Sequence, residues 1–370
     1  MKNASVAVLD IRSDKICAVI AEKGVNNTFI IKNKYSQPYE GYADGEMLDL
    51  EDFVSALKSA AENLYLSAGG KIKCVHVGVP AEFIELIQTD KVITYRSSQK
   101  ICERHIAEVK KFSTPKVEKG YTVCACDALF YYLSDKRKVL NPIGAISDSL
   151  RSRCCFYACK TGFIKAVKRG LKSLETVNEI HWIPQNRAEA FYLIPEERRG
   201  GYSVLLDFGY ISSSFNVIYG NGIVFSECFS IGVGHMAALV MEELDVPYEV
   251  ASELIKKVNL NSKGRRATVE EVIFDGKRYA YPSAQLKAII LEGLDAVCET
   301  LETCRQAFMG KDLSGVPIMI TGEGIGVIRG MTDHIASRLV TPVEVVSPSL
   351  PYYDKPVYSS LFSLLSAALN

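Results

Sequence analysis

Hydrophobic and polar positions follow the same order of elements twice along the chain. In the first half, apolar runs separated by polar turns predict strands over 5–10, 15–22 and 28–33, then an amphipathic helix over 50–66 and a strand over 73–79. Apolar residues recur in that helix at the spacing of a face that packs on a core. Strands and helices in this order indicate a layered α/β unit.

The second half repeats this unit, with predicted strands over 203–208, 213–219 and 223–230. Asn221-Gly222, between the last two strands, is a strong hairpin signal. Predicted helices follow over 234–245, 248–258 and 285–309. The polar stretch 259–283 is expected to form a loop. Two copies of one unit favour a clamp of two lobes.

Between the two copies the pattern changes, which indicates a compact α+β insert over 80–162. Its predicted elements are strands over 82–95, 121–133 and 151–159 and a helix over 100–112. A helix over 163–172 and a strand that ends near Pro184 then restore the earlier pattern. We therefore expect a first lobe of residues 1–79, 163–195 and 347–370, the insert, and a second lobe of residues 196–346.

Composition fits a soluble globular protein of more than one domain, since 48% of the 370 residues are apolar and 23% are charged. The formal net charge is zero, so nothing indicates nucleic-acid binding. No apolar run could span a membrane, and no export leader precedes the first strand, so we expect a cytoplasmic protein. The 11 cysteines show no C-x-x-C pairing, which favours reduced thiols over a zinc site.

The C-terminal stretch YSSLFSLLSAALN (358–370) has a stripe of leucines but carries no cation after Lys355. A helix that lies on a membrane surface normally has Lys or Arg on its polar face. We therefore expect this helix to pack on the first lobe. Any contact with a membrane would then go through a partner protein.

Both copies open with a strand that ends in an aspartate and returns as a second strand. The two stretches are VAVLDIRSDKICAVI (6–20) and LLDFGYISSSFNV (205–217), and a Thr-Gly-x-Gly loop follows in VPIMITGEGIGVIRGM (316–331). Together these motifs resemble the nucleotide cleft of the actin, Hsp70 and sugar-kinase superfamily. The resemblance implies an α/β, two-lobed actin-like (ribonuclease H-like) fold. It also implies Mg²⁺ on Asp10 and Asp207, and ATP between the lobes.

Two further stretches resemble FtsA, the actin homologue of bacterial cell division. They are NPIGAISDSLRSRCCFYACKTGFIKAVKRGL (141–171), which leaves the insert, and SIGVGHMAALVMEELDVPYEVASELIKK (230–257). The resemblance covers nearly the whole chain and places the insert in the first lobe, as that family does. The same stretches separate the chain less cleanly from PilM, a pilus-assembly relative with a comparable insert.

The first loop departs from the family pattern Asp-Ile-Gly-Thr-Ser-Lys. Arg12 replaces a glycine at which the backbone must approach a phosphate, although its guanidinium could itself clamp a phosphate. Ser13 keeps a hydroxyl group and Lys15 keeps a positive charge, and both are assigned to ATP binding. Asp14 adds a carboxylate that a polyphosphate would not favour.

The second and third loops are altered too. Gly209, Ser212 and Ser213 remain as candidate phosphate ligands, but Tyr210 and Ile211 replace two glycines of the phosphate nest. In the third loop Gly322 and Gly324 match the residues around adenosine, whereas Glu323 replaces a glycine. A carboxylate beside an α-phosphate would repel it.

Three further residues match functional positions of the family. Glu253 and Lys256 match the helix that contacts base and ribose, or form a solvated pair on that helix. Glu189, in QNRAEAF, lies where relatives position the attacking water and is the candidate catalytic residue.

The predicted function is a divergent FtsA-like cytoplasmic scaffold of bacterial cell division, with weakened ATP binding and little or no hydrolysis. Donors that stabilise a transferring phosphoryl group carry much of catalysis, and these are the groups that have been replaced. Its expected partners are copies of itself in a filament or an FtsZ-like protein. A PilM-like adaptor that binds a membrane-protein tail is the alternative. A superfamily kinase would need intact phosphate glycines and no such insert.

Overall fold

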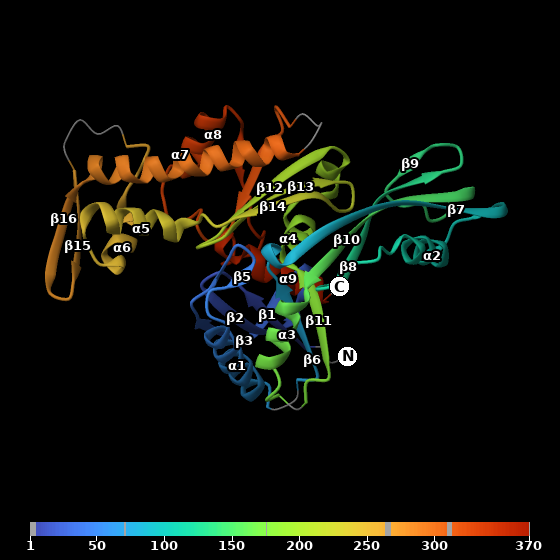
Figure 1. The fold of residues 1–370 in the computed structure, drawn as a ribbon, viewed down its shortest axis with the longest axis horizontal. Coiled ribbons are helices and arrows are strands. Elements are labelled where there is room, and N and C mark those ends of the chain that lie inside the picture. Colours follow the sequence, from blue (N-terminus) through green and yellow to red (C-terminus); the bar gives the residue numbers. More distant parts are fainter. Residues whose placement is uncertain (1–4, 70–71, 175, 263–267, 309–312, 370) are drawn as a thin grey trace.

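The computed structural model describes residues 5–69, 72–174, 176–262, 268–308 and 313–369. Figure 1 shows the blue first lobe below the yellow-to-red second lobe, while a green and cyan insert projects to one side. Each lobe is built on one five-stranded sheet, and the insert has a four-stranded sheet of its own.

The sheet of the first lobe has the order β11-β6-β1-β2-β3. Its strands are β1 (Ser5–Ile11), β2 (Lys15–Lys23), β3 (Phe29–Pro38), β6 (Cys74–Val79) and β11 (Glu179–Pro184). The first three form an antiparallel meander, and β6 and β11 run parallel to β1. One face packs on helices α1 (Leu50–Ser67) and α3 (Thr161–Gly170), and the other on α4 (Gln185–Leu193) and α9 (Ser359–Leu369).

The second lobe repeats this topology with the order β14-β13-β12-β17-β18. Its strands are β12 (Tyr202–Phe208), β13 (Ser213–Tyr219), β14 (Ile223–Phe229), β17 (Ile318–Thr321) and β18 (Val343–Val345). Again a meander leads, and two strands run parallel to its first strand. The helices α5 (Val233–Leu244), α6 (Tyr248–Lys257), α7 (Ser283–Ala307) and α8 (Met331–Leu339) cover one face. The predicted duplication is therefore confirmed.

The insert leaves the first lobe after β6 and returns to it before α3. Its elements are β7 (Ile84–Lys100), α2 (Glu103–Ser113), β8 (Tyr121–Leu133), β9 (Lys138–Val139) and β10 (Ile146–Lys160). The strands pair in the order β7-β10-β8-β9. Helix α2 packs on this sheet, where Val109 is buried with Ile101 and Leu150.

Short elements complete the fold. The first lobe has a small hairpin, β4 (Tyr42–Ala43) and β5 (Glu46–Met47). Single 3₁₀ turns lie at Val25–Asn27, Ala81–Phe83, Glu196–Gly200 and Pro356–Tyr358.

The C-terminal helix α9 packs against the sheet of the first lobe. Leu361, Phe362, Leu364 and Leu365 are buried in one cluster with Val8 and Val19 of the meander. Gly78 permits this approach, because a Cβ atom there would lie 2.6 Å from the Leu364 side chain. Among the residues described above, no helix is both long enough and apolar enough to cross a bilayer.

The prediction of a loop over 259–283 is wrong for the second half of this segment. That half forms a hairpin of β15 (Val269–Phe274) and β16 (Lys277–Pro282). Asp275 and Gly276 have φ angles of 50° and 75° and form its turn. Asp-Gly between β-rich runs is a hairpin signal, but the many charges of this segment hid it.

Helix α4 was not predicted from the sequence, because two opposite sides of it are buried and its hydrophobic pattern has no clear helical period. Ala188 packs in the core of the first lobe. Ala190 packs in a different hydrophobic cluster, among residues of the insert and of the second lobe. A helix covered in this way has no polar stripe to reveal its period.

Candidate functional site

A cavity of about 50 Å³ lies where the β1–β2 loop, the β12–β13 loop and the loop after β17 meet. Helices α4 and α9 close its remaining sides. Candidate residues that line it are Arg12, Ser13, Glu189, Asp207, Gly209, Ser212 and Gly322, joined by Asp14, Tyr42, Gln185, Tyr210, Glu323 and Ser360. Most of the predicted site is therefore brought together.

Asp10 lies directly behind this cavity and is completely buried. One carboxylate oxygen accepts hydrogen bonds from Gln185 Nε2 at 2.9 Å and Ser360 Oγ at 2.6 Å. The other accepts from Arg12 Nε at 2.9 Å. Gln185 begins α4 and Ser360 lies at the start of α9, and no sequence motif marks either of them as a partner of Asp10.

Arg12 and Lys15 connect the first lobe to Glu323 of the second. The Arg12 guanidinium donates to Glu323 at 3.1 Å, and the Lys15 ammonium contacts both Glu323 oxygens at 2.9 and 2.8 Å. Lys15 also donates to Asp14 at 2.8 Å. Glu323 therefore points into the cleft, and the cations expected to hold phosphate are bound to carboxylates of the chain itself.

The charges of this network support one another. Burial opposes the positive charge of Arg12, but Asp10, with Cys17 and Glu323, outweighs burial and raises the Arg12 pKa well above its usual value. Burial likewise opposes ionisation of Glu323, but Arg12 and Lys15 lower its pKa below the ordinary value. Both groups are ionised at neutral pH, and the network joins the lobes.

Asp207 and Glu189 face the same cavity with altered acidity. Burial, aided by the charges of Asp10 and Glu323, raises the pKa of Asp207 to about 6, although Arg12 acts in the opposite direction. Burial, followed by Asp207 and Asp10, raises the pKa of Glu189 well above its usual value. A protonated Glu189 is a poor base for activating water.

Groups of the second loop are occupied by internal hydrogen bonds. The Ile211 amide donates to Ser13 Oγ at 3.0 Å, and the Gly209 amide donates to Ser213 Oγ at 3.3 Å. Ser212 donates its hydroxyl hydrogen to Glu82. Donors that could bind a phosphate are therefore turned to partners within the protein.

The N-terminus of α5 closes over the carbonyls of the same loop. The Val233 and Gly234 amides donate to the carbonyl oxygens of Gly209 and Tyr210 at 3.1 and 2.9 Å. Free amides at a helix start are ready anion ligands, and here they are already used.

The third loop is fixed to β12. Gly322 has a φ of +103°, and a Cβ atom there would lie 2.3 Å from Asp207 Oδ1. The Gly324 amide donates to the Phe208 carbonyl oxygen at 3.0 Å. Glycine is therefore required at 322 by a close approach to the chain's own carboxylate.

Glu253 and Lys256 lie apart from this cavity. They form an exposed pair at 2.6 Å on α6, and neither residue lines the space described above.

No protein-family model matches the chain. The cell division protein FtsA of Streptococcus pneumoniae serotype 2 is 21% identical over 369 residues, which cover 96% of this chain and 78% of that protein. FtsA of Neisseria meningitidis serogroup B is 21% identical over 379 residues, which cover 98% of this chain and 90% of that protein.

Solved structures give a consistent fold. The PilM-PilN type IV pilus biogenesis complex matches with a TM-score of 0.66 at 14% identity, over 100% of this chain and 99% of the matched chain. MreB5 of Spiroplasma citri bound to AMPPNP matches with a TM-score of 0.57 at 10% identity, over 98% of this chain and 95% of the matched chain. The MamK double helical filament matches with a TM-score of 0.55 at 12% identity, over 98% of this chain and 99% of the matched chain.

The duplicated sheets and these matches define a protein of the actin-like fold. Within that class, the chain is similar to FtsA along nearly its whole length, at 21% identity. The fold and the family resemblance expected from the sequence are confirmed.

The residues of the cleft do not fit Mg²⁺ and ATP in this arrangement. Both oxygens of Asp10 accept hydrogen bonds, and Arg12 supplies the positive charge beside them. The cavity of about 50 Å³ is far smaller than the roughly 300–1,000 Å³ of small-molecule sites. Nucleotide could enter only if the contacts of Glu323 with Arg12 and Lys15 opened.

Proposed function

We propose that this protein is an FtsA-like cytoplasmic scaffold or adaptor of bacterial cell division that binds ATP weakly and hydrolyses little or none. It would assemble with copies of itself in a filament or with an FtsZ-like protein. The supporting observation is the ion-pair network in which Arg12 and Lys15 bind Asp10, Asp14 and Glu323.

The proposed organisation has a first lobe of 1–79, 163–195 and 347–370, the insert of 80–162, and a second lobe of 196–346. Opening the cleft for ATP would separate Glu323 from both cations. Carboxylates left in a buried site without their cations are costly, so nucleotide must first overcome this network. The network therefore favours a closed state that does not depend on ATP.

Catalysis is proposed to be weak for a separate reason. Glu189 is the candidate for positioning water, and burial raises its pKa, which disfavours the ionised form that could accept a proton. Glycines that would bring amides to a transferring phosphoryl group are replaced by Tyr210 and Ile211. Loss of such donors removes a large part of transition-state stabilisation.

A calorimetric titration with Mg-ATP tests the nucleotide part of the proposal. Wild type should bind weakly, and Arg12→Gly combined with Tyr210→Gly and Ile211→Gly should bind more tightly, because both loops regain their glycines. Glu323→Gly alone, which removes the carboxylate, should act in the same direction. Arg151→Gly on the insert is the matched control and should leave affinity unchanged. Tight binding by wild type, or equal affinity in all variants, would count against the proposal.

A PilM-like adaptor is a second candidate because the PilM-PilN complex shares the fold over the whole chain with a TM-score of 0.66. Such an adaptor would bind a short cytoplasmic tail of a membrane protein. Light scattering with and without Mg-ATP, alone and with a tubulin-like FtsZ, separates the two candidates. Assembly supports the cell-division scaffold, whereas no assembly together with tight binding of a membrane-protein tail supports the adaptor.

A further inference from the structure

Strands β6 and β11 carry matching pairs of metal-ligand side chains at their first residues. β6 begins Cys74-Val75-His76, and β11 begins Glu179-Ile180-His181. In the parallel pairing of these strands, Glu179 lies opposite Cys74 and His181 lies opposite His76. Alternate residues of a strand share a face, so the four side chains gather on one face of the sheet.

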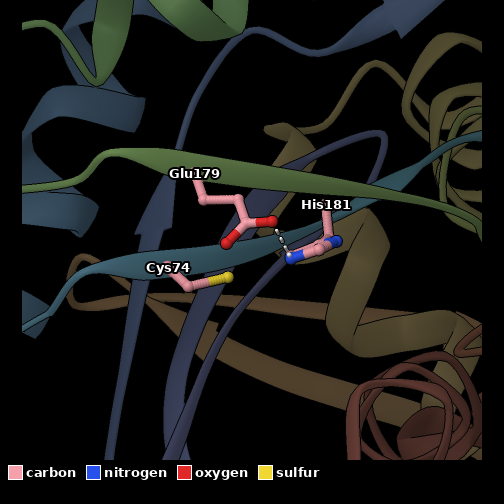
Figure 2. A group of neighbouring side chains, drawn as sticks. All are labelled: Cys74, Glu179 and His181. Atoms are coloured by element: carbon pink, nitrogen blue, oxygen red, sulfur yellow. Dashed lines mark ion pairs between the residues drawn. The ribbon is translucent and has the colours of Figure 1, made fainter.

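Distances among these side chains are those of a compact cluster. One ligand atom each of Cys74, Glu179 and His181 lies within 4.8 Å of the other two. Figure 2 shows these three side chains beside one another on the two strands. His181 Nε2 lies 3.1 Å from Glu179 Oε1, and Cys74 Sγ lies 3.9 Å from His76 Nε2. Ligands of a tetrahedral zinc ion are about 3.4–3.6 Å apart, given its bond lengths to sulfur, nitrogen and oxygen.

His76 lies beside this set of three and is the candidate for a fourth donor. Its ring stacks on that of His181, with centroids 4.9 Å apart and planes inclined by 18°. An ion pair of Glu179 with His181 explains two of the three clustered residues but does not explain why the Cys74 thiol lies beside them. A single bound metal ion would explain all three.

We propose that Cys74, Glu179 and His181, with His76 as fourth donor, form a binding site for one divalent transition-metal ion of the zinc class. Thiolate and imidazole donors favour such ions, whereas Mg²⁺ and Ca²⁺ favour sets of oxygen ligands. One thiolate and one carboxylate with two neutral imidazoles also balance the charge of a divalent ion. On binding, the Cys74 thiol loses its proton to the buffer as the metal–sulfur bond forms.

The position of the site indicates a structural role. β11 is the edge strand of its sheet, and hydrogen bonds to β6 are its pairing within that sheet. The far end of β11 leads directly into Gln185, which binds Asp10. A metal would fasten the edge strand at its start and so support the strand that positions α4. Side chains of His181 and Glu179 are 48% and 65% exposed, so a metal ion can enter from solvent.

Titration of the full-length, chelator-treated, reduced protein with Co²⁺ tests the site. We expect one Co²⁺ per chain, a thiolate-to-metal charge-transfer absorption and the visible bands of a tetrahedral ion, all displaced by Zn²⁺. Losing an outer-shell partner alone weakens metal binding about 10–100-fold, so Cys74→Ser and His181→Ala should each weaken it at least tenfold. His76→Ala should weaken it as well.

Two control variants keep the test specific. Cys102→Ser removes an exposed thiol elsewhere, and His334→Ala removes an imidazole of the second lobe; both should bind Co²⁺ as wild type does. Zn²⁺ should raise the melting temperature of wild type but not that of Cys74→Ser, which replaces sulfur by oxygen at a partly exposed position. Absence of the charge-transfer band, binding that survives both ligand substitutions, or one metal ion per two chains would overturn the proposal.

Discussion

The hairpins β1–β2 and β12–β13 occupy equivalent places in the two lobes, yet their aspartates have different surroundings. Asp10 and Asp207 are each the last residue but one of the first strand. Two positions later the first hairpin has Arg12, which binds Asp10, while the second has Gly209. Asp10 therefore has a cation of its own hairpin, whereas the pKa of Asp207 is raised to about 6 by burial. A duplicated backbone does not duplicate the chemistry.

The difference shows two ways in which this cleft accommodates more carboxyl groups than cations. Arg12 and Lys15 neutralise Asp10 and Glu323, and the pKa of Asp207 and that of Glu189 rise because of burial first and neighbouring carboxylates second. Ion pairing compensates the carboxylate charge in one hairpin, whereas the carboxyl groups beside the other are harder to ionise than usual.

Of the substitutions in the two hairpins, Arg12→Leu should lower the free energy of unfolding most. It leaves Asp10 and Glu323 without the guanidinium, and losing one partner of a buried ion pair costs about 3–5 kcal/mol. Urea unfolding followed by circular dichroism measures the change. Arg169→Leu, which removes an exposed partner of Glu51, is the control and should leave the midpoint unchanged. Equal midpoints for the two variants would mean that the network does not hold the lobes together.

Asp207→Asn should remove the pH dependence of stability that arises from the carboxyl group of the second hairpin. A carboxyl group whose folded pKa is raised to about 6 stabilises the fold below its unfolded pKa of about 4, and this contribution is lost as pH rises through 6. Asn stays neutral, so the variant should be more stable than wild type at pH 7 to 8 by about 1–3 kcal/mol. The two should differ little near pH 4.

The measurement is the free energy of unfolding in urea between pH 4 and 8. Glu253→Gln is the control, because this carboxylate is exposed on α6 outside the cleft and the wild-type profile should persist. An Asp207→Asn profile parallel to that of wild type at every pH would contradict the assigned pKa.

Ser13→Ala should weaken the direct link between the two hairpins by a smaller amount. The Ser13 hydroxyl accepts from the Ile211 amide at 3.0 Å, and an amide left without a partner costs about 1–2 kcal/mol. Differential scanning calorimetry should show a lower melting temperature. Ser5→Ala, which removes an exposed contact with Glu22, should not lower it. Equal melting temperatures would show that water replaces Ser13 without cost.

Lys256→Ala should have the smallest effect and tests a residue outside the cleft. Its pair with Glu253 is exposed on α6, so stability should change by less than the error of a urea titration. Mg-ATP affinity should also be unchanged if the pair is only solvated. A clear loss of affinity would instead support the predicted role at base and ribose.

The sequence predicted the fold well because the fold depends on local periodicity. β8 and β13 have the bounds expected from their apolar runs, and α7 lies within two residues of the expected range 285–309 at each end. Local signals failed where neighbours on opposite sides hide the period, as in α4, or where charges mask a hairpin, as at 269–282.

The candidate site was predicted only in part. Asp10, Asp207 and Glu189 meet at the cleft, as the resemblance to FtsA implied. The repulsive role expected of Glu323 gives way to pairing with Arg12, because the cations lie on the opposite lobe. No pattern within a single motif indicates a partner 311 positions away.

By itself, the sequence determined the duplicated unit, the aspartates at two strand ends and the loss of glycines around them. These are properties of neighbouring residues, and backbone periodicity and φ requirements act over a few positions. Only the tertiary structure decided that Arg12 binds Asp10 and Glu323, that Gln185 and Ser360 reach Asp10, and that β6 and β11 align their histidines. The reason is that burial and charge act through space, so the folded chain selects each partner.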